Sequence, residues 1–183
     1  VIQREYRGNL LPSVRQLLPL VPDSIFRPVT EWHVAGVFSP DADSATVVAL
    51  TTGRPLEGPP TASRVDWRTA SVVDGVLSLD RLFGLRDSSV AYATFALFSP
   101  REHVTLGRIR ANDRADLFVN GVQANEQPFR VTSSDPDYAL LPLRAGWNLI
   151  VVRVGNVTGR WTLSMQVADP EGDLRLAGTR PRG

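Results

Sequence analysis

The chain lacks several residue types, and each absence narrows what it can do. It contains no cysteine, so it forms no disulfide, offers no thiolate chemistry and suits any redox compartment. Its only histidines are His33 and His103, and two histidines without cysteine do not indicate a transition-metal centre. No apolar run approaches the roughly 20 residues that cross a bilayer, so we expect no transmembrane segment of its own.

Lysine is absent as well, and all 20 basic residues are arginine. Arginine is always charged and binds carboxylates through a planar fork, so it is not equivalent to lysine. A complete lack of lysine nevertheless fits a GC-rich gene better than selection at every basic position. The 19 acidic residues leave a net charge of +1, which gives no electrostatic reason to expect a nucleic-acid partner.

What the chain does contain is a series of short apolar or alternating segments between turn residues. Its 183 residues fit one domain, and 14 glycines and 14 prolines imply many turns. A strand about every ten residues is typical of an antiparallel sandwich or barrel. The expected strands lie at about 30–38, 45–50, 64–73, 89–98, 104–111, 115–122, 129–132, 138–143, 147–154 and 161–167. Residues 89–98 are apolar on both faces, which predicts a buried central strand.

The two ends of the chain differ from this pattern. We divide the chain into an N-terminal arm at 1–28, a sandwich domain at 29–170 and a basic, loose C-terminal tail at 171–183. The arm is leucine-rich, and its prolines predict one short helix at about 12–18. This helix either folds back on its own sandwich or docks on a partner chain. The side chains of the arm that would dock on a partner are Leu10, Leu11, Val14, Leu17 and Leu18.

Several segments in order resemble one known family. They are Trp32 to Phe38, with its Trp-x-Val-x-Gly-x-Phe pattern, the helical turn Leu82-Phe83-Gly84, the segment Leu117 to Gly121, and the run Ala145 to Val154. Together they resemble the galactose-binding-like jelly-roll domains over about residues 29–170. Such domains are accessory modules of bacterial secreted and surface proteins, and also the sugar-binding domains of β-galactosidase and β-glucuronidase-class enzymes. The resemblance implies an all-β fold: an antiparallel jelly-roll β-sandwich with a short N-terminal helical arm.

The resemblance also carries functional expectations. Family members are mostly non-catalytic, and they bind sugars or pack against other domains. It therefore implies no cofactor, and a location outside the cytoplasm, in the periplasm or at the cell surface. The residues that carry it have structural roles of their own, because Asn120 and Gly121 suit a tight hairpin turn and Asn148 can bond the backbone of its turn.

A sugar site needs exposed aromatic side chains beside polar groups. All four tryptophans lie inside strand patterns, so we assign Trp32, Trp67, Trp147 and Trp161 to the core. The candidate sugar contact is instead the loop between two short strands. Its residues are Phe129 and Tyr138 as a platform, with Asp135 and Asp137 as polar partners.

Calcium is a second candidate ligand. Some relatives carry paired aspartates at the turn occupied here by Asn112 and Asp113, and the asparagine lowers the charge of that turn. Calcium takes six to eight oxygen ligands, several of them carboxylates. Asp113 and Asp116, with Asp135 and Asp137, are the candidates, but turn capping explains the same residues. We therefore expect no metal.

The sequence holds no catalytic motif. There is no Gly-x-Ser-x-Gly elbow and no phosphate-binding glycine loop, so we do not expect an enzyme. Residues Asn156 to Thr158 match the N-glycosylation pattern, which carries little weight in a chain of bacterial character.

Three functions remain in order. The first is a structural or scaffolding subunit that docks on protein partners in a larger, membrane-associated assembly. The alternative is a carbohydrate-binding accessory module acting outside the cytoplasm. An esterase or hydrolase comes last, because its chemistry is missing. A sugar binder should expose two aromatic side chains beside polar groups, whereas a scaffold should bury its arm against another chain.

Overall fold

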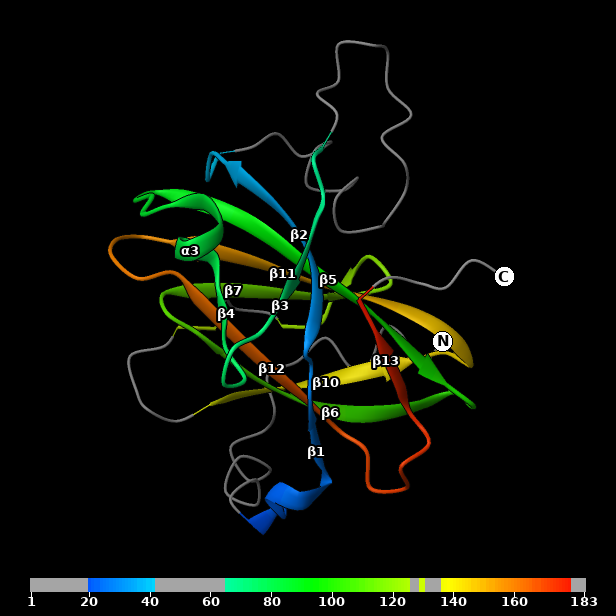
Figure 1. The fold of residues 1–183 in the computed structure, drawn as a ribbon. Coiled ribbons are helices and arrows are strands. Elements are labelled where there is room, and N and C mark those ends of the chain that lie inside the picture. The colour runs from blue at the N-terminus through cyan, green and yellow to red at the C-terminus, as the bar shows by residue number, and fades with distance from the viewer. Residues whose placement is uncertain (1–19, 42–64, 126–128, 131–135, 179–183) are drawn as a thin grey trace, which may run out of the picture.

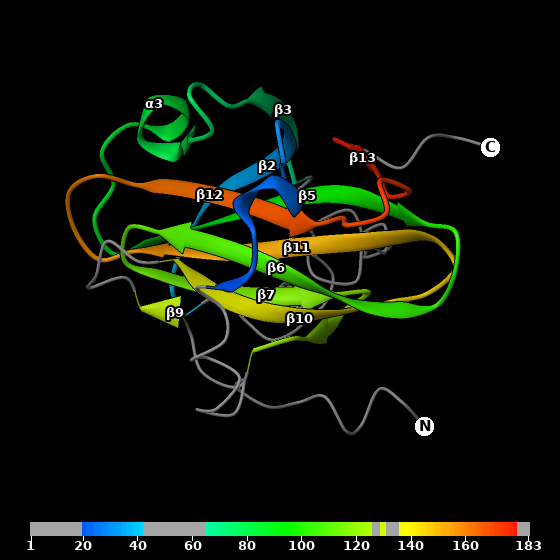
Figure 2. The same cartoon turned by 90° about the horizontal axis from the view of Figure 1, so that it is seen from below.

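The chain folds as two antiparallel β-sheets packed face to face (Figure 1; Figure 2). The structure is a computed structural model, and it describes residues 20–41, 65–125 and 136–178, together with the backbone of 129–130. The predicted helix at 12–18, the arm side chains from Leu10 to Leu18 and the predicted strand at 45–50 lie outside these residues. The predicted all-β sandwich is confirmed.

The smaller sheet has the strand order β1-β12-β6-β10, and β4 pairs with β12 beyond the end of β1. All its pairings are antiparallel. Its strands are β1 (Phe26–Pro28), β4 (Leu77–Ser78), β6 (His103–Ala111), β10 (Asp137–Leu143) and β12 (Thr162–Ala168). We call it the five-stranded sheet.

The larger sheet has the order β3-β2-β5-β11-β7-β8, with β13 added to β5 and β9 added to β7. Its central strands β5 and β11 pair over their whole length, from Ser89↔Asn156 to Ser99↔Gly146. Its strands are β2 (Glu31–Phe38), β3 (Arg68–Ser71), β5 (Ser89–Ser99), β7 (Arg114–Val119), β8 (Val122–Gln123), β9 (Phe129–Arg130), β11 (Gly146–Asn156) and β13 (Arg175–Ala177). We call it the eight-stranded sheet.

Helical structure is confined to two short elements among the described residues. A 3-10 turn, η3 (Asp23–Ile25), precedes β1, and α3 (Leu79–Phe83) follows β4. Gly84 ends α3 with φ +78°, a value that glycine adopts at little cost, as the sequence predicts. No helix in this part of the chain is long and apolar enough to cross a membrane.

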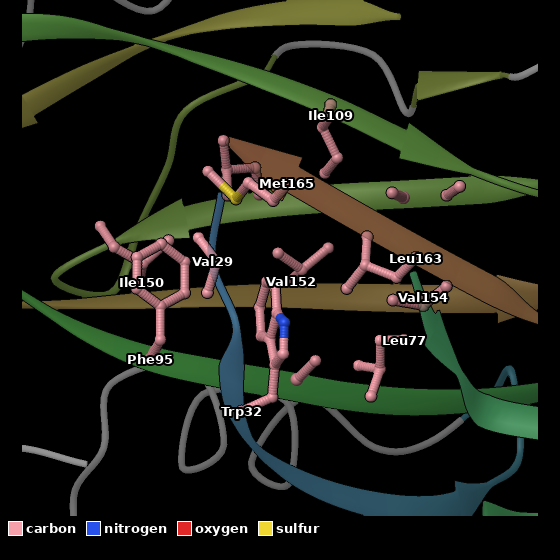
Figure 3. Close-up of a cluster of buried hydrophobic side chains, with 14 of the residues drawn as sticks. Val29, Trp32, Leu77, Phe95, Ile109, Ile150, Val152, Val154, Leu163 and Met165 are labelled. Atoms are coloured by element: carbon pink, nitrogen blue, oxygen red, sulfur yellow. The ribbon is translucent and has the colours of Figure 1, made fainter. Parts of the chain in front are cut away.

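The main core fills the space between the two sheets (Figure 3). Trp32 and Phe95 of the eight-stranded sheet meet edge to face, with ring centroids 5.1 Å apart. Leu163 and Met165 on β12 face them from the five-stranded sheet (Figure 3). The alternation of side chains along β2, β5, β11 and β12 therefore sends one face of each strand into a shared interior.

A second and smaller apolar cluster lies on the outer face of the eight-stranded sheet. Val90, Tyr92 and Val151 are fully buried there, and partly buried neighbours pack against them. These neighbours are Phe38, Val65, Trp67, Phe118 and Leu149. Strand β5 is thus buried on both faces, as its two-sided apolar pattern predicts.

The structure corrects one expectation and shows how the described end of the arm meets the sandwich. The predicted loose tail is ordered at its start, because β13 pairs with β5 through Arg175↔Phe98 and Ala177↔Ala96. In the predicted arm, β1 likewise pairs with β12. Both pairings join segments far apart in the sequence, and no local sequence pattern predicts them.

The tryptophan assignment holds for only two of the four residues. Trp32 and Trp161 are fully buried in the core. Trp67 and Trp147 are half-buried and lie on the outer face of the eight-stranded sheet or beside it. Trp147 faces outward because its register places it opposite Phe98, one position out of phase with the core residue Leu97.

Candidate functional site

Three side chains from three strands form a row on the outer face of the eight-stranded sheet. Trp147 on β11 pairs with Phe98 on β5, which pairs on its other side with Arg175 on β13 (Figure 1). The two rings meet edge to face with centroids 5.4 Å apart. Both aromatic residues are half-buried and Arg175 is exposed. We call this set the aromatic row.

Within the aromatic row, the guanidinium of Arg175 stacks on the two rings. Its Cζ atom lies 3.9 Å from the centroid of Phe98 and 5.8 Å from that of Trp147. Such cation–π contacts hold an arginine side chain in a defined orientation. The row therefore combines aromatic faces with a fixed set of N–H donors at one surface.

The turn before β11 places Trp147 in the row. Gly146 has φ +92°, a left-handed value that suits glycine and starts the strand sharply. The buried side chain of Asn148 then holds this turn together. Its Oδ1 accepts from Arg144 N at 2.9 Å, and its Nδ2 donates to the carbonyls of Arg144 and Gly146 at 2.9 and 3.1 Å.

The loop at 169–174 places Arg175. Asp169 Oδ1 accepts hydrogen bonds from the backbone N–H groups of Asp173 and Leu174 at 3.1 and 3.4 Å, which closes the loop. Arg101 contacts both Glu171 and Asp173 in ion pairs on the same loop. The hydrogen bond and charge of Arg101 hold the pKa of Glu171 below its usual value.

Smaller side chains lie next to the aromatic row on the same face of the sheet. By register, the neighbouring row of outward positions carries Leu149, Ala96 and Ala177, two of which are alanines. The row after that carries His33 and Thr94 beside the apolar Val151 and Phe118, and His33 Nε2 lies 3.0 Å from the Oγ1 of Thr69. The aromatic rings are thus bordered by a row with two alanines and then by a row that is polar over β2 and β5 and apolar over β11 and β7.

The structure describes only part of the predicted sugar loop. Tyr138 lies on the outer face of the five-stranded sheet, edge to face with Phe26 at 6.3 Å. Asp137 begins the same strand, β10. Phe129 begins β9 in the other sheet, and its side chain and all of Asp135 lie outside the described residues. The loop therefore stays a prediction.

The calcium candidates that the structure describes have other partners. Asp113 Oδ2 accepts from the backbone N–H groups of Val157 and Thr158 at 2.7 and 3.4 Å, as a turn cap does. Asp116 is buried beside Arg153 at 3.2 Å. Within the described residues, no three acidic, histidine or cysteine side chains gather where a metal ion could be held.

One histidine does lie against a serine. The Oγ of Ser99 is 3.2 Å from His103 Nδ1, but it also donates to the carbonyl of Arg101 at 2.5 Å. Ser99 has no exposed surface at all. Its hydroxyl therefore cannot approach a substrate, and the pair closes the turn after β5.

The glycosylation pattern at Asn156 is not accessible. Asn156 is 3% exposed, and its Nδ2 donates to the carbonyl of Arg86 at 2.8 Å. A glycan needs a free side-chain amide at the surface. This asparagine instead links the end of β11 to the segment before β5.

Sequence reasoning missed the aromatic row. It treated every tryptophan in a strand as a core residue, and it ended the sandwich before Arg175. One signal was available for Trp147. Side chains alternate along a strand, so Trp147 lies on the opposite face to the buried Asn148 and Ile150. Arg175 has no comparable local signal.

Comparison with known proteins shows the fold and nothing narrower. No protein-family model and no curated protein matches the chain. Among solved structures, the β-glucuronidase of Ruminococcus gnavus is similar at 12% identity with a TM-score of 0.52, over 80% of this chain. The chain spans 29% of that enzyme's length. The likeness shows the fold, an antiparallel β-sandwich of the kind that the resemblance to the galactose-binding-like domains implies.

Two further structures are similar at lower scores. A family 35 carbohydrate-binding module from an environmental isolate has 19% identity and a TM-score of 0.41, over 54% of this chain and 80% of the module. A β-glucuronidase from an uncultured Clostridium species has 10% identity and a TM-score of 0.49, over 79% of this chain and 29% of the enzyme.

Proposed function

We propose that the chain is a non-catalytic carbohydrate-binding accessory module that binds its glycan at the aromatic row. The observation that carries the proposal is the pairing of Phe98 and Trp147 as half-exposed aromatic neighbours on a sheet face. Aromatic side chains offer a large, rigid and amphipathic surface, and the C–H face of a sugar ring stacks on such a surface. Arg175 supplies hydrogen-bond donors beside it.

The fold supports the same proposal by analogy only. A sandwich of this type forms part of the Ruminococcus gnavus β-glucuronidase, and the name of that enzyme says that it acts on a glycoside. A fold alone does not give a function, so the argument depends on the aromatic row. Action outside the cytoplasm is part of the proposal and rests on the habits of the resembled family.

The scaffold hypothesis has less support. Its basis is the leucine-rich arm, whose apolar residues lie outside the described part of the chain. Phe98 and Trp147 are two half-exposed aromatic residues, and such a pair is expected of a sugar binder rather than of a scaffold. We therefore place carbohydrate binding first and keep protein docking as a prediction to be tested.

The test is a binding screen with matched variants. Soluble polysaccharides are titrated against the wild-type chain, Trp147→Ala and Phe98→Ala by calorimetry and affinity electrophoresis. Tyr138→Ala is the control and also tests the predicted sugar loop, because Tyr138 is a half-buried aromatic residue on the outer face of the other sheet. We expect each row variant to lose about tenfold or more in affinity, with the control unchanged.

Circular dichroism establishes that each variant is folded, and Trp147→Leu serves if Trp147→Ala is not. The proposal is wrong if the wild-type chain binds no polysaccharide. It is also wrong if Tyr138→Ala weakens binding as much as the row variants do, because the site would then lie on the five-stranded sheet.

A further inference from the structure

We propose that the aromatic row selects glycans that carry a negatively charged group, and that Arg175 recognises this group. The inference rests on the proposed function, because it names the ligand class of the same site. The charged group is a carboxylate or a sulfate, since the two share the oxygen geometry that a guanidinium fork binds.

The first argument is that Arg175 carries an unused charge. Within the described residues it makes two ring contacts, with Phe98 and Trp147, and no hydrogen bond or ion pair. Stacking engages the flat face of a guanidinium and leaves the N–H groups at its edge free to donate. An exposed arginine of this kind holds donors ready for a ligand.

The nearby carboxylates do not take up these donors. Glu171 and Asp173 both pair with Arg101, and Asp169 pairs with Arg27 at 2.7 Å. Each acidic side chain of the loop that leads into β13 thus has an arginine partner other than Arg175. Other arginines thus neutralise the loop's own negative charges.

The second argument is that Arg175 is already oriented. Its contact with Phe98 at 3.9 Å fixes the side chain before any ligand arrives, so less side-chain entropy is lost on binding. At the greater distance of 5.8 Å, the guanidinium covers the ring of Trp147 less than it covers that of Phe98. One sugar residue can then stack on Trp147 while its charged group meets the edge of Arg175.

The experiment compares charged and neutral polysaccharides on the same variants. The probes are polygalacturonate for carboxylate, chondroitin sulfate for sulfate together with carboxylate, and a neutral galactan. They are titrated by calorimetry against the wild-type chain, Arg175→Gln and Arg175→Lys. The control is Arg110→Gln, because Arg110 is an exposed arginine on β6 of the other sheet.

We expect Arg175→Gln to lose about tenfold or more in affinity for the charged probes and little for the galactan. Arg175→Lys should fall between, because lysine keeps the charge but not the fork. Raising the salt concentration should weaken charged-probe binding by the wild-type chain more than by Arg175→Gln. Arg110→Gln should match the wild-type chain throughout.

The outcomes separate the two proposals. If Trp147→Ala abolishes binding but Arg175→Gln binds every probe as the wild-type chain does, the module binds glycans and the charge selectivity is wrong. Equal losses for Arg175→Gln and Arg110→Gln would show a diffuse charge effect and also overturn the inference. If the wild-type chain binds none of the probes or other polysaccharides, both proposals fail.

Discussion

The guanidinium of Arg27 donates a hydrogen bond of 2.7 Å to the carboxylate of Asp169 and another of 2.6 Å to the carbonyl of Leu174. Arg27 lies on β1, and Asp169 starts the loop that leads into β13. The contact therefore ties the first strand of one sheet to the loop that positions Arg175 in the other. Asp169 is the buried partner, with a side chain only 1% exposed, whereas that of Arg27 is 45% exposed.

The first prediction concerns this pair. Asp169→Ala removes the ion pair with Arg27 and both hydrogen bonds to the loop backbone, and we expect it to lower the free energy of unfolding by about 3 kcal/mol. Urea unfolding measures the change. Asp66→Ala is the control, because Asp66 is 73% exposed and its pair with Arg68 should contribute about 0.5 kcal/mol or less. Equal losses in the two variants would mean that burial of Asp169 does not matter.

The second prediction concerns Asn148. This side chain is 1% exposed and links three segments: it accepts from Asn120 Nδ2 at 2.8 Å and donates to the carbonyl of Leu97 at 3.3 Å, besides closing its own turn. Asn148→Ala leaves several buried backbone groups without a partner, so we expect a loss of about 3 kcal/mol in the free energy of unfolding. Thermal and urea unfolding measure it.

Asn112→Ala is the control for that variant. Asn112 is exposed in the turn between β6 and β7, and its backbone N–H donates to the carbonyl of Thr162 at 3.2 Å. We expect a change within about 0.5 kcal/mol. A small effect at Asn148 would show that the turn before Trp147 holds its shape without the side-chain amide.

The third prediction compares two glycines inside strands. A Cβ at Gly107 would meet Met165 Cε at 3.1 Å and Leu141 Cδ1 at 3.2 Å, within the packed core. A Cβ at Gly155 would meet Arg114 Cβ at 3.6 Å, which is ordinary contact. Gly107→Ala should therefore destabilise by about 1–3 kcal/mol, whereas Gly155→Ala should be neutral or slightly stabilising. Chemical denaturation of both variants checks the difference, and a tolerated Gly107→Ala would indicate looser packing between the sheets.

Local chemistry made most of the fold predictable. Asn120 and Gly121 adopt the positive φ values, 51° and 80°, that their hairpin predicts, and Gly84 ends α3 as expected. These features depend on residues adjacent in sequence. The two-sided apolar pattern of β5 likewise identified the central strand.

The candidate site was not predictable in the same way. A tryptophan in a strand is buried or exposed according to register, and one step separates Trp147 from the buried Asn148. The place of Arg175 depends on β13 joining β5 beyond the end of β2, a contact between residues far apart in the chain. The alternation along β11 could have placed Trp147 on the face opposite to the core, whereas no residue adjacent in sequence indicates the place of Arg175.

The fourth prediction concerns pH. Burial raises the pKa of Tyr92 above 10.0, and the nearby charge of Arg153 opposes this effect only in part. Because the folded-state pKa exceeds the unfolded value, the unfolded chain loses this proton first as the pH rises. The contribution of Tyr92 to stability is therefore complete below about pH 10 and is lost as the pH rises from there through the folded pKa.

The variant Tyr92→Phe should therefore lose less of its free energy of unfolding than the wild-type chain does as the pH rises above this value. Urea unfolding across the alkaline range, with tyrosinate absorbance as the titration signal, measures both, and an unchanged slope in Tyr92→Phe would assign the loss to other groups.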